Sequence, residues 1–132
     1  FSSAHDAMIL SAAGCFDAVE TLRQGLEGAA AGGRGTVGAA NHALGVPLVA
    51  AMAAHRKGEY GRVVDLIWPI RRDLYQIGGS HAQRDIFYQV LVDAAVKAER
   101  RSQAAIALAD IAGFGGVGDR TLYRDAAAAA AA

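Results

Sequence analysis

The stretch GGSHAQRDIFYQVLVDAAVKA, residues 78–98, decides the fold of this chain. Ser80 and Gln83 have the spacing of a capping box, in which both side chains accept backbone N–H groups at a helix start. Apolar residues then recur at the spacing of one helix face, namely Phe87, Val90, Leu91, Ala94, Ala95 and Ala98. The stretch therefore predicts an amphipathic helix that begins at Ser80.

Period-two alternation is nearly absent from the rest of the chain, so we expect helices there and not strands. Glycines and prolines mark where these helices begin and end. These helices are expected at residues 4–13, 16–26, 40 or 46 to 57, 60–77 and 102–112. Pro47 suits a kink or a first helical turn, whereas Pro69 lies inside a helix and predicts a kink there. The glycine-rich residues 28–38 predict a loop. The sequence as a whole predicts an all-α protein.

The expected helices form pairs across three short turns. The turns are Gly14–Phe16, Gly58–Tyr60 and Glu99–Arg101, and their last residues are 44 and 41 positions apart. A period near 40 is typical of helix-pair repeats, which bury their apolar faces by stacking. We therefore expect three antiparallel helix pairs, at about 1–27, 39–77 and 80–112. Residues 113–132 read as a glycine-rich turn and a tail that ends in alanines, to which we assign no function.

Two stretches carry a resemblance to a known family. Residues 55–70, HRKGEYGRVVDLIWPI, resemble the turn and second helix of a tetratricopeptide repeat, with Gly58, Tyr60, Val63 and Val64 in the expected places. Together with residues 77–95 and 1–8, they resemble the carboxy-terminal part of the tetratricopeptide repeat protein 38 family. The resemblance covers roughly residues 1–112. It implies a solenoid of tetratricopeptide-like helix pairs within a longer, cytoplasmic protein, and a scaffold role.

Composition argues against two classes of partner. Thirteen basic and thirteen acidic residues give a formal net charge of zero, which is unlike a nucleic-acid-binding domain or a surface that binds anionic lipid. The longest charge-free stretch, residues 35–55, is interrupted by Asn41, Gly45 and Pro47, so it predicts no membrane span. The single cysteine, Cys15, cannot form an internal disulfide, which favours the cytoplasm, and we expect it to be buried.

The leading hypothesis for function is a binding scaffold without catalysis. Stacked helix pairs leave a concave surface that is made by the first helix of each pair. Arg84, Tyr88, Gln89 and Asp93 are expected to line this surface and to contact a peptide or a protein partner. Self-association is a further expectation, because a truncated stack exposes apolar faces at its ends.

The competing hypothesis is a small-molecule or catalytic site at residues 78–85. A helix amino terminus attracts anions, and Arg84 could add donors beside His81 and Asp85. His5 and His42 also fall near the start of a first helix, so they could converge on this site as acid–base groups or metal ligands. The structural interpretation is a capped helix whose charged residues form salt bridges. Whether the chain is an enzyme stays open, and we assign it no cofactor or metal.

Overall fold

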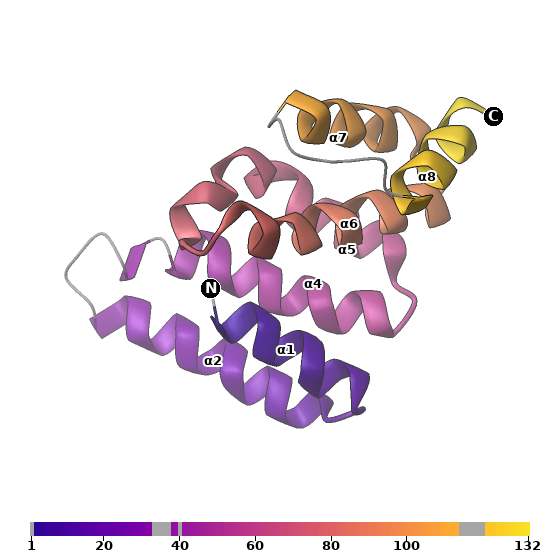
Figure 1. The fold of residues 1–132 in the computed structure, drawn as a ribbon. Helices are drawn as coiled ribbons and strands as arrows, with labels where there is room; N and C mark the ends of the chain where they lie inside the picture. Colours follow the sequence, from indigo (N-terminus) through magenta and orange to yellow (C-terminus); the bar gives the residue numbers. More distant parts are fainter. Residues whose placement is uncertain (1, 33–37, 40, 114–120) are drawn as a thin grey trace.

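The computed structural model describes residues 2–32, 38–39, 41–113 and 121–132, and every element within these ranges is helical (Figure 1). The prediction of an all-helical protein is confirmed for this part of the chain. In chain order the elements are α1 (Ser2–Ala12), α2 (Phe16–Gly32), the π-helical turn η1 (Asn41–Gly45), α4 (Val46–Arg56), α5 (Tyr60–Ile67), the 3₁₀-helix η2 (Trp68–Ile77), α6 (His81–Lys97), α7 (Arg101–Gly113) and α8 (Thr121–Ala131).

Three tight turns of the same geometry join α1 to α2, α4 to α5 and α6 to α7. In each turn one residue has a positive φ: 77° at Gly14, 77° at Gly58 and 58° at Glu99. The N–H of the next residue bonds to the carbonyl five positions back, as from Cys15 to Leu10 at 2.9 Å. This pair of features is a Schellman motif, and it satisfies carbonyls at a helix end while it reverses the chain.

The helix pairs lie against one another in chain order. α4 packs against both α1 and α2, and α6 packs against α5 and makes fewer contacts with α4. α8 covers parts of α6 and α7. Consequently the first helices of the three pairs, α1, α4 and α6, follow one another through the molecule (Figure 1).

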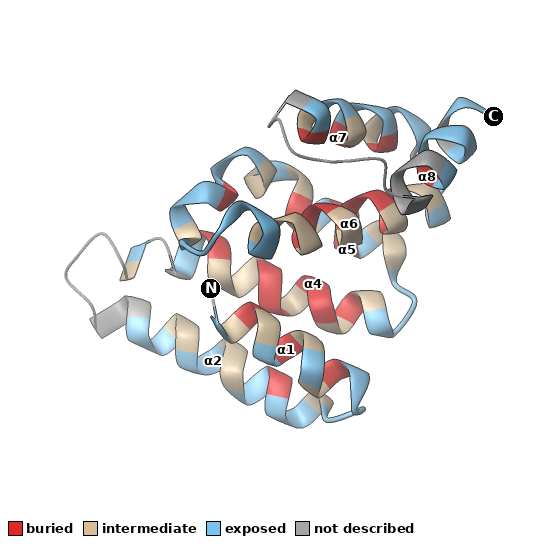
Figure 2. Cartoon of the chain, in the orientation of Figure 1, coloured by how far each residue is buried: buried red, intermediate tan, exposed pale blue. Residues whose placement is uncertain are grey.

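The hydrophobic core follows α4 and α6, whose inward positions are fully buried (Figure 2). Leu48 and Val49 of α4 and Phe87 and Leu91 of α6 are each 0 % exposed. Burying such side chains stabilises the fold by about 1.5–3 kcal/mol each. The core therefore fixes α4 and α6, two of the three helices that line the site described below.

The two prolines act as their positions predict. Pro47 lies in the first turn of α4, where its missing N–H costs no helical hydrogen bond. Pro69 lies where a longer helix would need a backbone donor, and the α-helical part ends at Ile67. The chain then continues as the 3₁₀-helix η2 to Ile77. The expected kink at Pro69 is thus a change of helix type.

Three details differ from the sequence-based expectations. α2 continues through Gly28 to Gly32, so the expected loop begins later, and residues 33–37 and 40 lie outside the described ones. α8 occupies much of the segment that was interpreted as a tail. Cys15 is exposed, which corrects the expectation that it is buried, because the turn after α1 places it at the surface.

Candidate functional site

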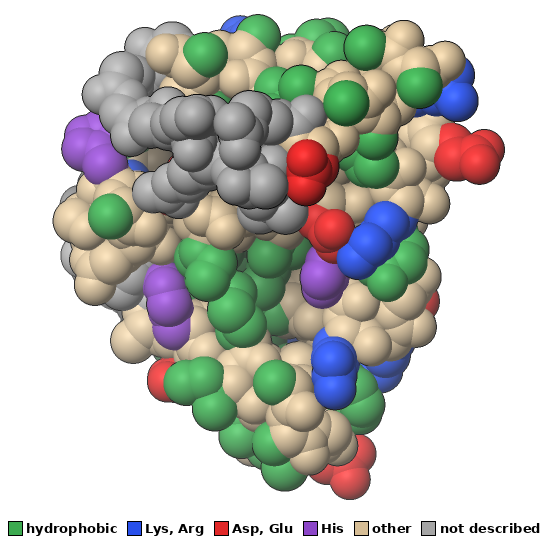
Figure 3. All heavy atoms as spheres, turned by 45° about the vertical axis from the view of Figure 1, so that its right-hand side comes forward, with side chains coloured by type: hydrophobic (Ala, Val, Ile, Leu, Met, Phe, Trp, Pro, Cys, Tyr) green, Lys and Arg blue, Asp and Glu red, His purple; other side chains and the backbone are tan. Residues whose placement is uncertain are grey.

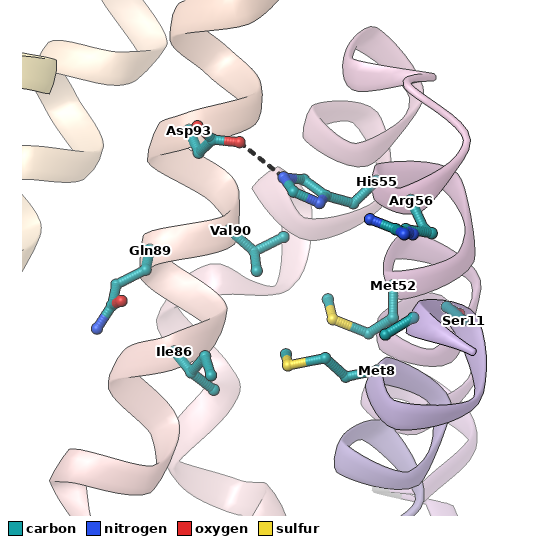
Figure 4. Close-up of a pocket in the computed structure, with 10 residues that line it drawn as sticks. Met8, Ser11, Met52, His55, Arg56, Ile86, Gln89, Val90 and Asp93 are labelled. Carbon is teal, nitrogen blue, oxygen red and sulfur yellow. Dashed lines mark hydrogen bonds and ion pairs between the residues drawn. The ribbon is translucent and has the colours of Figure 1, made fainter. Parts of the chain in front are cut away.

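A groove of about 340 Å³ lies between α1, α4 and α6 (Figure 4). Ten residues line it: Met8, Ser11 and Ala12 of α1, Met52, His55 and Arg56 of α4, and Ile86, Gln89, Val90 and Asp93 of α6. Figure 3 shows a face of the molecule on which hydrophobic side chains gather in a hollow, with histidine and charged side chains beside them. A concave, mostly apolar surface with a few polar groups is the usual form of a binding site.

Apolar side chains from all three helices form most of the groove surface. Met8 and Met52 are the two methionines of the chain, and Figure 4 shows them side by side opposite Ile86 and Val90. Met52 is 3 % exposed, whereas Val90 and Ile86 are half-buried. A thioether side chain is flexible and polarisable, so this part of the groove can adapt to ligands of different shape.

Asp93 joins α6 to α4 at one end of the groove. Its Oδ2 lies 2.7 Å from His55 Nε2 and accepts a hydrogen bond of 2.9 Å from Lys97 Nζ. The Lys97 ammonium also lies 4.9 Å from the centre of the Tyr60 ring. The negative charge of Asp93 is therefore shared between two side chains of its own protein.

These contacts change the acidity of Asp93. Its partial burial would by itself raise the pKa of the carboxyl group, but the hydrogen bonds from Lys97 and His55 outweigh burial. The net effect is a pKa below the ordinary value of 3.8. The carboxylate consequently stays ionised, and stays engaged with its two partners, at neutral pH.

Arg56 is the contrasting charge of the groove. It is the last residue of α4 and is exposed, and Figure 4 shows its guanidinium turned toward the space between α4 and α6. Among the described residues, no acidic side chain forms an ion pair with it. Its hydrogen-bond donors are therefore available to a ligand.

Ser11 is the buried polar residue of the groove wall. It is 1 % exposed, and its hydroxyl has no hydrogen-bond partner within the described part of the chain. A buried hydroxyl without a partner costs about 1–3 kcal/mol. An apolar residue at this position would therefore make the fold more stable than Ser11 does.

Two of the four residues predicted for a concave face line the groove, and two do not. Gln89 and Asp93 line it on α6. Tyr88 is 7 % exposed and its hydroxyl donates to Arg71 O at 2.5 Å, so it belongs to the packing between α6 and η2. Arg84 donates to the carbonyls of Gly78 and Gly79, with 3.2 Å to the former.

The start of α6 uses its polar groups internally. The capping box is present, since Ser80 Oγ accepts from Gln83 N at 3.3 Å and Gln83 Oε1 accepts from Ser80 N at 2.8 Å. Asp85 accepts from Gln89 Nε2 at 2.7 Å, and His81 is exposed. With Arg84 bound to the preceding connector, these contacts favour the structural interpretation of residues 78–85.

His5 and His42, which could have converged on residues 78–85, lie on α1 and η1. His5 of α1 contacts the Phe87 ring edge-on, with 5.2 Å between the ring centres. His42 is exposed on η1. Among the residues that the structure describes, no three His, Cys, Asp or Glu side chains are grouped so that they could hold a metal ion.

Sequence reasoning missed most of the groove, including His55, to which it assigned no role. One signal was available in the internal spacing. The groove residues of α4 (Met52, His55 and Arg56) follow those of α1 (Met8, Ser11 and Ala12) by 44 positions, which is also the offset from Gly14 to Gly58. Aligning the helices on their turns would have identified these positions as equivalent.

No protein-family model matches this chain, and no solved structure matches it. Within the described ranges, no helix has the length and hydropathy that crossing a membrane requires. The functional argument therefore rests on the geometry of the groove.

Proposed function

We propose that this chain is a helical-repeat binding scaffold whose groove between α1, α4 and α6 holds a segment of a peptide or protein partner. One observation carries the proposal: the first helix of every pair contributes side chains to the same apolar groove. A surface built by successive helix pairs is the surface that solenoid proteins use for binding.

The repetition of the turns supports a stacked-repeat interpretation. Gly14, Gly58 and Glu99 have the same sign of φ and the same hydrogen-bond pattern, at offsets of 44 and 41 residues. We therefore propose a tetratricopeptide-like arrangement and membership of the tetratricopeptide repeat protein 38 family. This proposal also gives the protein a cytoplasmic location, with which a single exposed cysteine is compatible.

The size and chemistry of the groove suit side chains of a folded or extended segment. Its volume of about 340 Å³ lies at the lower end of the range of ligand pockets, which is roughly 300–1,000 Å³. An apolar centre with polar groups at its edge is also the usual composition of a protein–protein contact. A few apolar side chains of a partner would therefore fill the groove, with its backbone at the surface.

A peptide-display experiment tests the proposal. A library of random dodecapeptides is selected on the purified protein, and enriched peptides are measured against two variants, Ala12→Trp and Ala105→Trp. Both alanines are exposed on helices, but Ala12 lines the groove and Ala105 lies on α7. We expect Ala12→Trp to weaken binding at least tenfold, because the indole obstructs the groove, and Ala105→Trp to leave binding unchanged. Enriched peptides that are insensitive to Ala12→Trp would refute the proposal.

A further inference from the structure

The guanidinium of Arg56, which has no ion-pair partner among the described residues, indicates the charge of the segment that the groove binds. We infer that the groove recognises an apolar side chain beside an aspartate or glutamate, and that Arg56 binds the acidic side chain. This inference rests on the proposed function, since it names the chemistry of the segment that the groove would hold. It adds a specificity-determining residue to the groove.

The charged side chains of the groove differ in whether the protein itself compensates them. Three charged or titratable side chains line it: His55, Arg56 and Asp93. Asp93 is engaged by His55 and by Lys97, and its pKa is lowered below 3.8 although its burial works in the opposite direction. The carboxylate of the groove is thus already compensated, whereas the guanidinium of Arg56 is not. The groove consequently favours an acidic group and disfavours a basic one.

Arg56 lies close to the apolar part of the groove. Arg56 follows Met52 by four positions, so the two side chains lie on the same face of the helix about one turn apart. Both line the groove. A partner side chain that packs on the thioether of Met52 therefore places its neighbour within reach of the guanidinium. Hence we expect the acidic residue next to the apolar one, or one helical turn away in a helical partner.

The shape of a guanidinium group suits it to bind a carboxylate. Its planar fork of N–H donors matches the two oxygens of a carboxylate and can bind them with two parallel hydrogen bonds. Because Arg56 is exposed, solvent weakens this contact, as it does for exposed ion pairs in general. We therefore expect it to change affinity only roughly threefold to fivefold. The apolar part of the groove therefore provides most of the affinity, and Arg56 provides selectivity.

Parallel selections on two variants test the inference. The random dodecapeptide library is selected on the wild type, on Arg56→Gln and on Lys57→Gln. Lys57 is the matched control, because it is exposed, directly follows Arg56, and does not line the groove; its ammonium lies over the Phe16 ring. Both variants lose one positive charge, so a difference between them reports on the position of the charge.

The expected result is a motif that depends on Arg56. Peptides from the wild type and from Lys57→Gln should pair an apolar residue with Asp or Glu, and peptides from Arg56→Gln should lack the acidic preference. For one selected peptide, changing its acidic residue to the amide should weaken binding to the wild type about threefold to fivefold. The same change should have no effect on Arg56→Gln.

Methionine methyl signals show whether these peptides occupy the groove. The chain has two methionines, Met8 and Met52, and both line the groove, so both methyl resonances of ¹³C-methyl-labelled protein report on it. We expect both signals to move when the selected peptide is added.

Three results would overturn the inference. An apolar motif without an acidic residue, equal on wild type and Arg56→Gln, would refute it and leave the binding groove intact. An acidic preference lost equally in both variants would assign it to overall charge. Peptides that leave both methyl signals unmoved would refute the inference together with the proposed function.

Discussion

Replacing Asp93 by asparagine removes the charge that joins α4 and α6 at the end of the groove. Asparagine has nearly the same shape and can still accept hydrogen bonds, so the substitution leaves packing in place. What is lost is the attraction of the carboxylate for His55 and for Lys97, at 2.7 and 2.9 Å. The variant therefore measures the charge in this contact.

The magnitude follows from the exposure of the three side chains. Lys97 is 45 % exposed and lies four positions from Asp93, and such pairs contribute about 0.3–0.5 kcal/mol. The His55 and Asp93 side chains are 30 % and 27 % exposed, which places their contact nearer to a buried hydrogen bond of roughly 1 kcal/mol. Since asparagine keeps part of the second contact, we expect a loss of about 1 kcal/mol at pH 7.

The effect should depend on pH in a defined direction. The pKa of Asp93 in the folded protein is lower than the ordinary 3.8, because the hydrogen bonds from Lys97 and His55 outweigh the opposing effect of burial. A lowered pKa contributes stability that is fully present above the unfolded-state value and is lost as pH falls through the folded-state value. The difference between wild type and Asp93→Asn should therefore shrink as pH falls from about 5 to below 3.8.

Urea unfolding followed by circular dichroism at pH 7, 5 and 3 measures this difference. Asp6→Asn is the control, because Asp6 is exposed on α1 and has no ion pair among the described residues. Its free energy of unfolding should differ from that of the wild type by less than about 0.5 kcal/mol. A difference for Asp93→Asn that is equally large at pH 5 and pH 3 would show that the charge is not its origin.

Two further substitutions test features of the helix pairs by the same urea measurement. Glu99 has a φ of 58° where the equivalent turns have glycine, so Glu99→Gly should raise the free energy of unfolding by about 1 kcal/mol, and an unchanged or lower value would contradict the strain at this turn. Ser11→Ala removes a buried hydroxyl that has no described hydrogen-bond partner and should also stabilise by about 1 kcal/mol, whereas a loss of stability would mean that the hydroxyl is satisfied.

Local signals in the sequence were sufficient for most helix boundaries. The capping box at Ser80 and the first-turn proline at residue 47 act through neighbours in the chain, so they can be interpreted without a structure. Gly28 shows the limit of such signals, because α2 continues through it. The intrinsic cost of glycine in a helix, about 1 kcal/mol, is small enough for the rest of a helix to outweigh it.

The residues of the site depend on contacts that no local signal contains. Tyr88 was expected to line a surface that contacts a partner, yet η2 covers it and the Arg71 carbonyl accepts a hydrogen bond from its hydroxyl. That cover exists because the chain changes to a 3₁₀-helix near Pro69 and passes along α6. The change of helix type could be anticipated, but its path could not.

His55 illustrates why equivalence between repeats is more informative than the chemistry of single residues. At the end of α4 a histidine suits the helix dipole, and that local reason is sufficient to explain it. Its equivalent on α1 is Ser11, 44 positions earlier, and both line the groove. One position of the repeat thus holds a buried hydroxyl without a described partner and the other a histidine paired with Asp93. Polar groups on a wall that packing alone would make apolar are the reason why our proposal places binding at this groove and not at residues 78–85.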